Sequence, residues 1–275
     1  MKKIKKTFLI FALAVSALIP CHAVKRPTIV KGNSKITEKK VGNSKKSVKH
    51  HGSVETKMAE KHPKAKKKES KNNKKPSITV KWMDKNPCWT DEPRTIKPGG
   101  IMVHSTASPG MMALDWYEKW NKSLEEGGKE VAVHAFLDDK CIMQYLPWTK
   151  RAWHCGKGEN GSGNDTHISI EMCEPSSIIY NSNRSEIVSY DPKDPENKKY
   201  FNSALKNMVD LCAYLCNEFK IKPKNIICHH EGHELGIASD HADVLHWWPL
   251  HGVTMDMFRQ MVEDTIQGKP VKYDF

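Results

Sequence analysis

The sequence has no hydrophobic run that is long enough to cross a bilayer comfortably. Its N-terminal apolar stretch extends only from Phe8 to Pro20, whereas a membrane-spanning helix needs about 20 apolar residues. The stretch follows a lysine-rich start and precedes the small residue Ala23, which is typical of a cleaved export signal over residues 1–23. We therefore expect an exported protein, periplasmic or secreted, and we favour ordinary cleavage over lipid attachment at Cys21 because proline fits a lipidation site poorly.

Large apolar side chains are scarce in the next segment, where lysine, serine and asparagine dominate. Such a segment cannot bury enough surface to offset its ordering entropy, so residues 24–78 are expected to form a disordered, lysine-rich linker. Acidic residues are scarce there too, because residues 24–80 carry 18 basic and 4 acidic side chains. With the four lysines of the signal segment and a total of +12, this leaves residues 81–275 with a net charge of −6.

The folded part therefore lacks the basic face that a specific nucleic-acid-binding protein needs. Two interpretations of the linker stay open, electrostatic contact with anionic envelope polymers and a solvated spacer. We see no signature of a protein partner and expect a monomer.

A fully paired disulfide framework is excluded because an odd number of cysteines, seven, follows residue 23. Several of them lie in apolar runs, where a free cysteine behaves as a small buried hydrophobe. One or two disulfides remain open, and no pair is indicated.

Residues 79–268 have the pattern of one folded domain without internal repeats, followed by a C-terminal tail over residues 269–275. Short apolar runs predict buried strands, and apolar residues at helical spacing predict helices. The strands are expected over residues 101–104, 131–137, 141–146, 167–173 and 226–228, the helices over residues 111–123, 201–219 and 255–266, and loops over residues 147–165 and 174–199. This mixture predicts an α/β fold with a central mixed sheet flanked by helices.

Potential metal ligands are concentrated near the C-terminus: His229, His230, Asp240, His241, Asp243 and His246. With His104 at the end of an apolar run, they indicate a divalent metal held between distant segments by imidazole and carboxylate groups. From the residues alone, the ligands are His104, one of the pair 229 and 230, and an acid or histidine after Ser239. Such ligands with room for a water favour a hydrolase.

The zinc helix of thermolysin-type peptidases is not present in this region. That motif places two histidines four residues apart with glutamate after the first, whereas His230 and His233 are three residues apart. Gly232 also weakens a helix at this place. The sequence therefore predicts a site built from strand ends and a loop.

Two further features admit both a functional and a structural interpretation. Glu171, in an otherwise apolar run, either points to solvent or lies in a pocket with a raised pKa, ready to take a proton from water. Trp148, Arg151, Trp153 and His154 combine flat surfaces with donors, which suits a sugar or peptide ligand and equally suits ordinary packing.

Five motifs, in order, resemble those of the type 2 zinc-dependent N-acetylmuramoyl-L-alanine amidases, whose fold is shared with peptidoglycan recognition proteins. The resemblance covers Thr79 to Arg259, and the motifs span residues 101–106, 133–136, 144–156, 164–171 and 227–247. It implies hydrolysis of the amide bond between N-acetylmuramic acid and L-alanine in peptidoglycan or muropeptides. Two rival functions stay open, a non-catalytic peptidoglycan-binding module and a zinc peptidase that cuts within the stem peptide.

The resemblance also implies roles for single residues. One zinc ion is assigned to His104, His229 and Asp243, with Asp240 and His241 as alternatives for the third ligand.

Glu171 matches the general base of one branch of the family, since Val133 stands where another branch has tyrosine. His241 takes the place of a lysine that stabilises the oxyanion, a role that depends on its protonation. Substrate contacts are expected from the motif residues His134, Trp148, Arg151, Trp153, His154 and Asn164.

Overall fold

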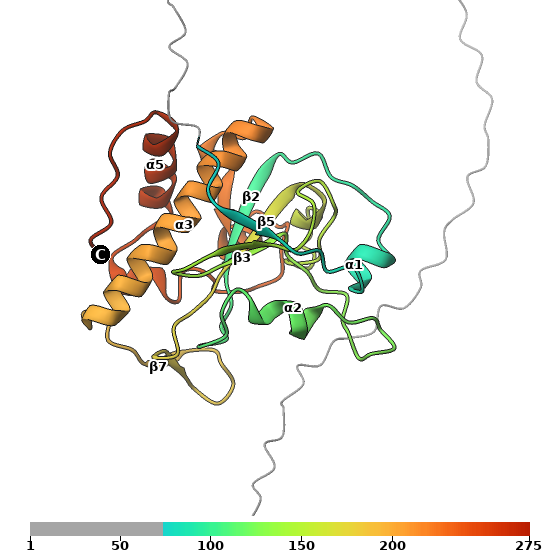
Figure 1. The fold of residues 1–275 in the computed structure, drawn as a ribbon, viewed down its shortest axis with the longest axis horizontal. Helices are drawn as coiled ribbons and strands as arrows, with labels where there is room; N and C mark the ends of the chain where they lie inside the picture. Colours follow the sequence, from blue (N-terminus) through green and yellow to red (C-terminus); the bar gives the residue numbers. More distant parts are fainter. Residues whose placement is uncertain (1–73) are drawn as a thin grey trace, which may run out of the picture. The chain divides into compact units, whose positions relative to one another are not determined.

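The computed structural model describes residues 74–275, so the predicted signal and residues 24–73 of the predicted linker lie outside the described residues. Its centre is a six-stranded mixed sheet, in which only the β3–β4 pair is antiparallel (Figure 1). In spatial order the strands are β1 (Ile78–Val80), β4 (Ile142–Gln144), β3 (Ala135–Leu137), β5 (His167–Met172), β2 (Gly100–Ser105) and β8 (Ile226–Cys228). The predicted α/β fold with a central mixed sheet is confirmed.

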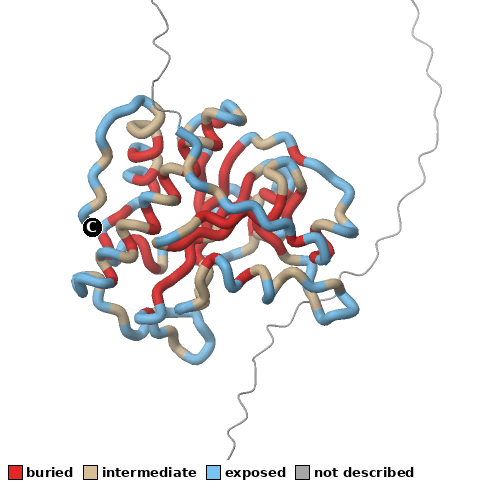
Figure 2. Tube along the Cα trace, in the orientation of Figure 1, coloured by how far each residue is buried: buried red, intermediate tan, exposed pale blue. Residues whose placement is uncertain are grey.

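Helices cover both faces of the sheet, as alternate residues of β3 show. Ala135 and Leu137 belong to the core formed with α3 (Pro195–Phe219) and α5 (Met255–Ile266), which lie side by side (Figure 1). Phe136 points to the other face, where it stacks on Trp116 of α2 (Asp115–Trp120) with ring centroids 4.6 Å apart. Figure 2 shows the central strands and part of α3 as buried, and every residue of β2, β3, β4 and β8 is buried.

The long helix α3 begins six residues before the predicted start at residue 201. Asp194 caps it by accepting hydrogen bonds from the backbone amides of Glu196 and Asn197, and Pro195 occupies the first turn, where a missing N–H costs nothing. The helix ends at Lys220 in the left-handed conformation. Because its first turn is polar, apolar periodicity does not reveal where the helix begins.

Several predicted boundaries are corrected by the structure. Helix α2 is shorter than the predicted 111–123, and the predicted strand 131–137 is regular only over β3, because Ala132 pairs instead with Trp153. The predicted loop 174–199 contains a hairpin of β6 (Ile179–Tyr180) and β7 (Ile187–Ser189). The remaining short elements are α1 (Pro87–Thr90), α4 (His229–Glu234) and the 3-10 turns η1 (Gly163–Asp165), η2 (Pro223–Asn225) and η3 (Trp248–His251).

The last seven residues contact the domain and do not extend away from it. Tyr273 and Phe275 pack against the core, and the backbone N–H of Phe275 donates to Oδ1 of Asn202 at 3.1 Å. These aromatic side chains bury surface that a free tail would leave in water. Within residues 74–275 all seven cysteines are free thiols, and no helix in that range is long and apolar enough to cross a membrane.

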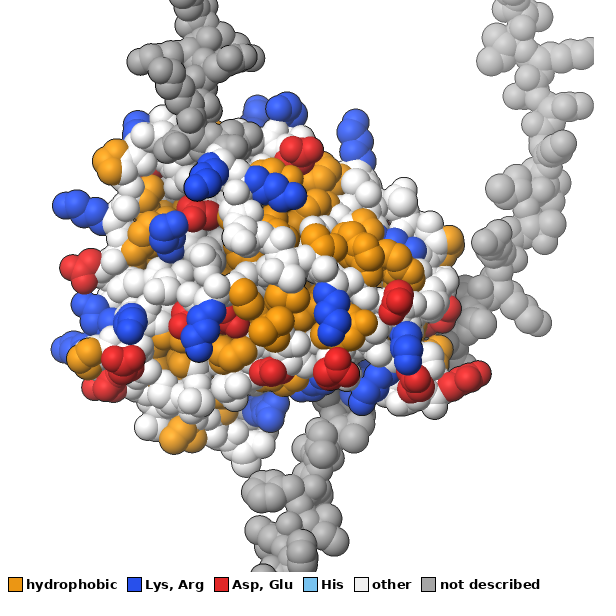
Figure 3. All heavy atoms as spheres, in the orientation of Figure 1, with side chains coloured by type: hydrophobic (Ala, Val, Ile, Leu, Met, Phe, Trp, Pro, Cys, Tyr) orange, Lys and Arg blue, Asp and Glu red, His pale blue; other side chains and the backbone are white. Residues whose placement is uncertain are grey.

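Charges of both signs are mixed on the surface drawn in Figure 3, with hydrophobic side chains between them. This face has no extended region of one sign, as expected from the small net charge of residues 81–275.

Candidate metal centre

Two histidines meet because their strands are parallel neighbours. His104 lies near the end of β2, and His229 directly follows β8, which pairs with β2 so that Val103 faces Cys228. Both imidazoles are buried, and their Nδ1 atoms are 3.2 Å apart. Register alone therefore brings together two nitrogens from residues far apart in the sequence.

Asp243 completes this cluster from the loop that follows α4. Its Oδ2 lies 2.9 Å from Nδ1 of His104, and its Oδ1 lies 3.6 Å from Nδ1 of His229. The loop is tied back where the backbone N–H of His230 donates to the carbonyl of Asp243 at 3.2 Å. One ligand atom from each of the three residues lies within 4.8 Å of the others.

Burial and the interactions between these side chains shift their pKa values in opposite directions. Burial by itself would raise the pKa of Asp243, but hydrogen bonds from His104 and His229 hold that pKa well below its usual range. Burial lowers the pKa of His104 despite the opposing effect of Asp243. The site is therefore built to hold an anionic carboxylate between two imidazoles, which is a donor set suited to a divalent cation.

Glu171 lies on β5 in register with His104 on β2. Its Oε2 is buried and has no hydrogen-bond partner among the described residues. Burial, reinforced by the charges of Asp243 and Glu174, raises its pKa well above the usual value. Of the two interpretations that the sequence left open, the burial of Oε2 favours a buried carboxyl group with a raised pKa over an exposed one.

Of the alternative ligands, only His241 contacts the cluster. Its ring stacks on His229 with centroids 4.5 Å apart, and its Nδ1 lies 3.8 Å from Oδ1 of Asp243. The side chain is 60% exposed, so it faces the space above the ligands. Asp240 is exposed and lies 3.9 Å from His233, while His230 pairs with Glu234.

The segment that begins at His229 is a helix, contrary to the expectation from Gly232. Helix α4 starts at a capping box in which the side chain of Glu231 accepts from the backbone N–H of Cys228 at 3.0 Å. A Cβ atom at Gly232 would lie 2.8 Å from Cε of Met102, so glycine here permits close packing of α4 on β2. The effect of packing thus exceeds the low helix propensity of glycine.

Three of the predicted substrate-binding residues bond to other parts of the protein through their polar side-chain atoms. His134 accepts from the backbone N–H of Ser169 at Nδ1 (3.0 Å), and its Nε2 lies 2.8 Å from the carbonyl oxygen of Lys150. Arg151 is buried in ion pairs with Glu92 and Asp165. Asn164 is fully buried and bonds to the backbone of residues 154–156. These side chains support the loop that carries His154, and the structure does not bring them to the ligand cluster.

The other three predicted substrate residues are placed differently. Trp148 packs on the ring of His134 at 6.3 Å. Trp153 is 39% exposed and lines a cavity of about 190 Å³ with Arg151, whose guanidinium lies 5.0 Å from its ring. His154 contacts the cluster directly, with Nδ1 2.9 Å from Nε2 of His104. Burial, followed by the nearby His104, holds the pKa of His154 well below its usual value.

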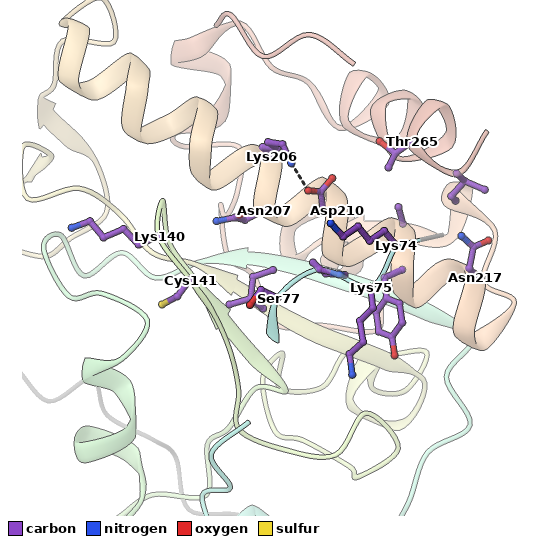
Figure 4. Close-up of a pocket in the computed structure, with 15 residues that line it drawn as sticks. Lys74, Lys75, Ser77, Lys140, Cys141, Lys206, Asn207, Asp210, Asn217 and Thr265 are labelled. Carbon is purple, nitrogen blue, oxygen red and sulfur yellow. Dashed lines mark hydrogen bonds and ion pairs between the residues drawn. The ribbon is translucent and has the colours of Figure 1, made fainter. Parts of the chain in front are cut away.

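A larger cavity of about 590 Å³ lies at the opposite edge of the sheet, between residues 74–77, β4, α3 and α5. In Figure 4, which draws the residues that line this cavity, Lys206 is paired with Asp210. None of the residues that line this cavity is a candidate ligand, so the cavity is separate from the candidate metal centre.

One buried network beside the ligands was not predicted from the sequence. Glu174 is fully buried, and it accepts from the backbone N–H of Ala107 (3.2 Å) and from the hydroxyl of Tyr180 (2.9 Å). Nε2 of His246 lies 3.1 Å from the same carboxylate and 3.4 Å from Oγ of Ser105. Glu174 sits in a polar stretch before Pro175, where no local pattern distinguishes it from a surface acid.

Comparison with known proteins agrees with this geometry. A family model described as N-acetylmuramoyl-L-alanine amidase matches residues 94–244. N-acetylmuramoyl-L-alanine amidase CwlA of Bacillus subtilis (strain 168) is 35% identical over 82 residues, which are 30% of this chain and 28% of that protein. N-acetylmuramoyl-L-alanine amidase XlyA of the same organism is 51% identical over 74 residues, which are 27% of this chain and 24% of that protein. The match thus spans less than a third of these relatives.

Solved structures share the fold. The structure of PlyL superposes with a TM-score of 0.50 at 25% identity, and the match covers 68% of this chain and 97% of that chain. Staphylococcus aureus AmiA gives a TM-score of 0.51 at 19% identity, over 70% of this chain and 84% of that chain. The family model covers more than half of the sequence, and the matched residues include His104, His229 and Asp243. The chain therefore belongs to the N-acetylmuramoyl-L-alanine amidase family.

Proposed function

We propose that this protein hydrolyses the amide bond between N-acetylmuramic acid and L-alanine in peptidoglycan. The observation that carries the proposal is the convergence of His104, His229 and Asp243. Glu171 is in register with His104, and its buried Oε2 has no hydrogen-bond partner within residues 74–275. The family and the printed names of the relatives support the choice of this amide bond.

The residues present fit a single zinc ion. Catalytic zinc sites use three protein ligands of the imidazole and carboxylate kind and keep one position for water or substrate. Here the Nδ1 atoms of His104 and His229 and the carboxylate of Asp243 would hold the ion. When bound, zinc would supply Lewis-acid chemistry that activates water and polarises the amide carbonyl.

The remaining chemistry falls to two side chains of the protein. Glu171 would take a proton from the attacking water at its carboxylate and return it to the leaving amine, which requires a carboxyl group that exchanges protons near neutral pH. Its buried Oε2 suits that role, because no donor from the described part of the chain competes for the oxygen. His241, exposed above the ligands, would support negative charge on the substrate carbonyl oxygen.

Cleavage of the wall places the site of action in the envelope. The predicted export signal over residues 1–23 and the predicted basic linker over residues 24–78 support an exported enzyme, periplasmic or secreted, and we propose that it is a monomer. Contact of the linker with anionic polymers would then hold the catalytic domain near its substrate.

Mass spectrometry of digested sacculi tests the proposal and separates it from its rivals. Free lactyl carboxyl ends on muramic acid, together with intact stem peptides, are the expected products. Shortened stems would indicate a peptidase instead, and tight binding without any product would indicate a recognition module.

A further inference from the structure

The two candidate ligand histidines present the same ring nitrogen to the cluster. Nδ1 of His104 faces both Asp243 and Nδ1 of His229, so Nδ1 is the ligand atom of each ring. A neutral imidazole has one protonated and one unprotonated nitrogen. A ligand Nδ1 therefore requires the ring proton on Nε2.

His154 accepts the hydrogen bond that Nε2–H of His104 donates. Its Nδ1 lies 2.9 Å from Nε2 of His104, and the two rings meet edge to face with centroids 5.1 Å apart. If the proton of His104 were on Nδ1, toward Asp243, that nitrogen could not act as a ligand. Once Nε2 of His104 donates to His154, the proton of His154 must lie on its own Nε2.

The surroundings of His154 are consistent with this arrangement. Its Nε2 is buried without a hydrogen-bond partner among the described residues. A buried donor without an acceptor costs about 1–3 kcal/mol, which favours a functional reason for keeping histidine here. The backbone of His154 is fixed, because its N–H donates to Oδ1 of the fully buried Asn164 at 2.7 Å.

The next residues support the second ligand in the same way. Nε2 of His229 lies 3.4 Å from Oγ of Ser239, and this hydroxyl donates to the carbonyl of Cys155 at 3.2 Å. Gly156 has φ of +64°, and a Cβ there would lie 3.1 Å from Oγ of Ser239. The loop at residues 154–156 thus contacts the outer nitrogen of His104 directly, and it is linked to that of His229 through Ser239.

We propose that His154 is a positioning residue, which fixes the ring plane and tautomer of His104 for metal binding through Nδ1, and is not a substrate-binding residue. Partners of this kind orient metal-ligating histidines, and removing one typically weakens metal affinity by about 10–100-fold. The inference rests on the metal site of the proposed function, but it concerns zinc affinity and not the bond that is cleaved.

Zinc affinity, measured by competition with a chromophoric chelator, tests this role. His154→Phe keeps a flat ring and removes the acceptor, so it should bind zinc about 10–100-fold more weakly. His154→Asn keeps an acceptor near the position of Nδ1 and should recover most of the affinity. His167→Phe is the control, because His167 is in register with Gly100 at the other end of β2. The zinc affinity of this variant should equal that of the unaltered protein.

Unchanged affinity in His154→Phe, or equal weakening by Phe and Asn, would overturn the proposal. If the variants do not fold, the unaltered protein with ¹⁵N-labelled histidine and bound zinc decides the question. A nitrogen–nitrogen coupling across the hydrogen bond from Nε2–H of His104 to Nδ1 of His154 is expected, and its absence would overturn the proposal.

The two proposals fail separately. A protein that loses zinc affinity in His154→Phe but releases no muramic acid carboxyl ends would refute the amidase activity and leave the role of His154 intact. If the protein cleaves the wall and binds zinc equally with and without His154, the amidase activity stands and the role of His154 is refuted. Failure of the unaltered protein to bind zinc would overturn this inference.

Discussion

Glu171 lies in register with His104 on the adjacent parallel strand, so that a carboxyl group and a candidate ligand share one face of the sheet. Side chains of register partners in parallel strands point to the same side. This relationship places the candidate base beside the candidate metal without any help from loop conformation.

Glu171→Gln should therefore abolish turnover while keeping the zinc site. The amide is nearly isosteric but accepts no proton, and general acid–base catalysis contributes about 10²–10⁴-fold to rate. Release of stem peptides from sacculi should fall by that factor, with zinc content unchanged. Glu125→Gln, at an exposed glutamate, serves as the control, and equal rates in the two variants would remove Glu171 from the mechanism.

His241 should affect the rate and leave metal binding intact. His241→Ala removes the donor above the ligands, and loss of one oxyanion donor lowers kcat by about 10²–10³-fold. His241→Lys should recover much of the rate, because an ammonium group can also donate a hydrogen bond to the carbonyl oxygen. If the alanine variant instead lost its zinc, His241 would be a ligand and not a donor.

Folding stability should decrease below pH 6.5 because of His134. Burial lowers the pKa of this histidine to about 4 in the folded protein, whereas an unfolded histidine titrates near pH 6.5. Between these values the unfolded chain binds a proton that the folded protein does not, so the stability present above pH 6.5 is lost as the pH falls toward 4. The slope is about 1.4 kcal/mol per pH unit for one proton.

His134→Gln, which does not titrate, should reduce that slope by about 1.4 kcal/mol per pH unit. Urea unfolding at several pH values between 4.5 and 6.5 measures it. His167 and His251 also have pKa values lowered to about 4 by burial, so part of the pH dependence should remain in the variant. An unaltered slope would show that the pKa of His134 is the same in the folded and unfolded states.

Tyr180→Phe should destabilise the fold by about 1–3 kcal/mol, because it leaves a buried oxygen of Glu174 without its hydrogen-bond donor. Its hydroxyl donates to the fully buried carboxylate of Glu174, which also contacts His246. Chemical denaturation measures the change, with Tyr214→Phe in the C-terminal half of α3 as the control. Equal stability of the two variants would mean that water replaces the Tyr180 hydroxyl.

The sequence predicts the parts of this site that depend on strands. Apolar runs mark β2 and β8, and histidines at the ends of two buried strands can meet at one edge of a sheet. Asp243 could not be selected this way, because its position depends on a loop. Only the resemblance to a family distinguished it from Asp240 and His241.

What the sequence could not predict depends on contacts between distant segments. His134 and Asn164 were expected at the substrate, yet their polar atoms satisfy the backbone of neighbouring loops. A buried histidine and a ligand-binding histidine have the same sequence signal. The partners of Glu174 come from the turn after β2, from β6 and from the loop after Asp243, so no local period marks them.

The zinc content of the purified protein and of single alanine variants, measured after dialysis, tests the central claim most directly. The account predicts one zinc per chain in the unaltered protein, and loss of that zinc in His104→Ala, His229→Ala and Asp243→Ala. His230→Ala and Asp240→Ala should keep it. Retention of zinc in Asp243→Ala, or no zinc in the unaltered protein, would contradict the account.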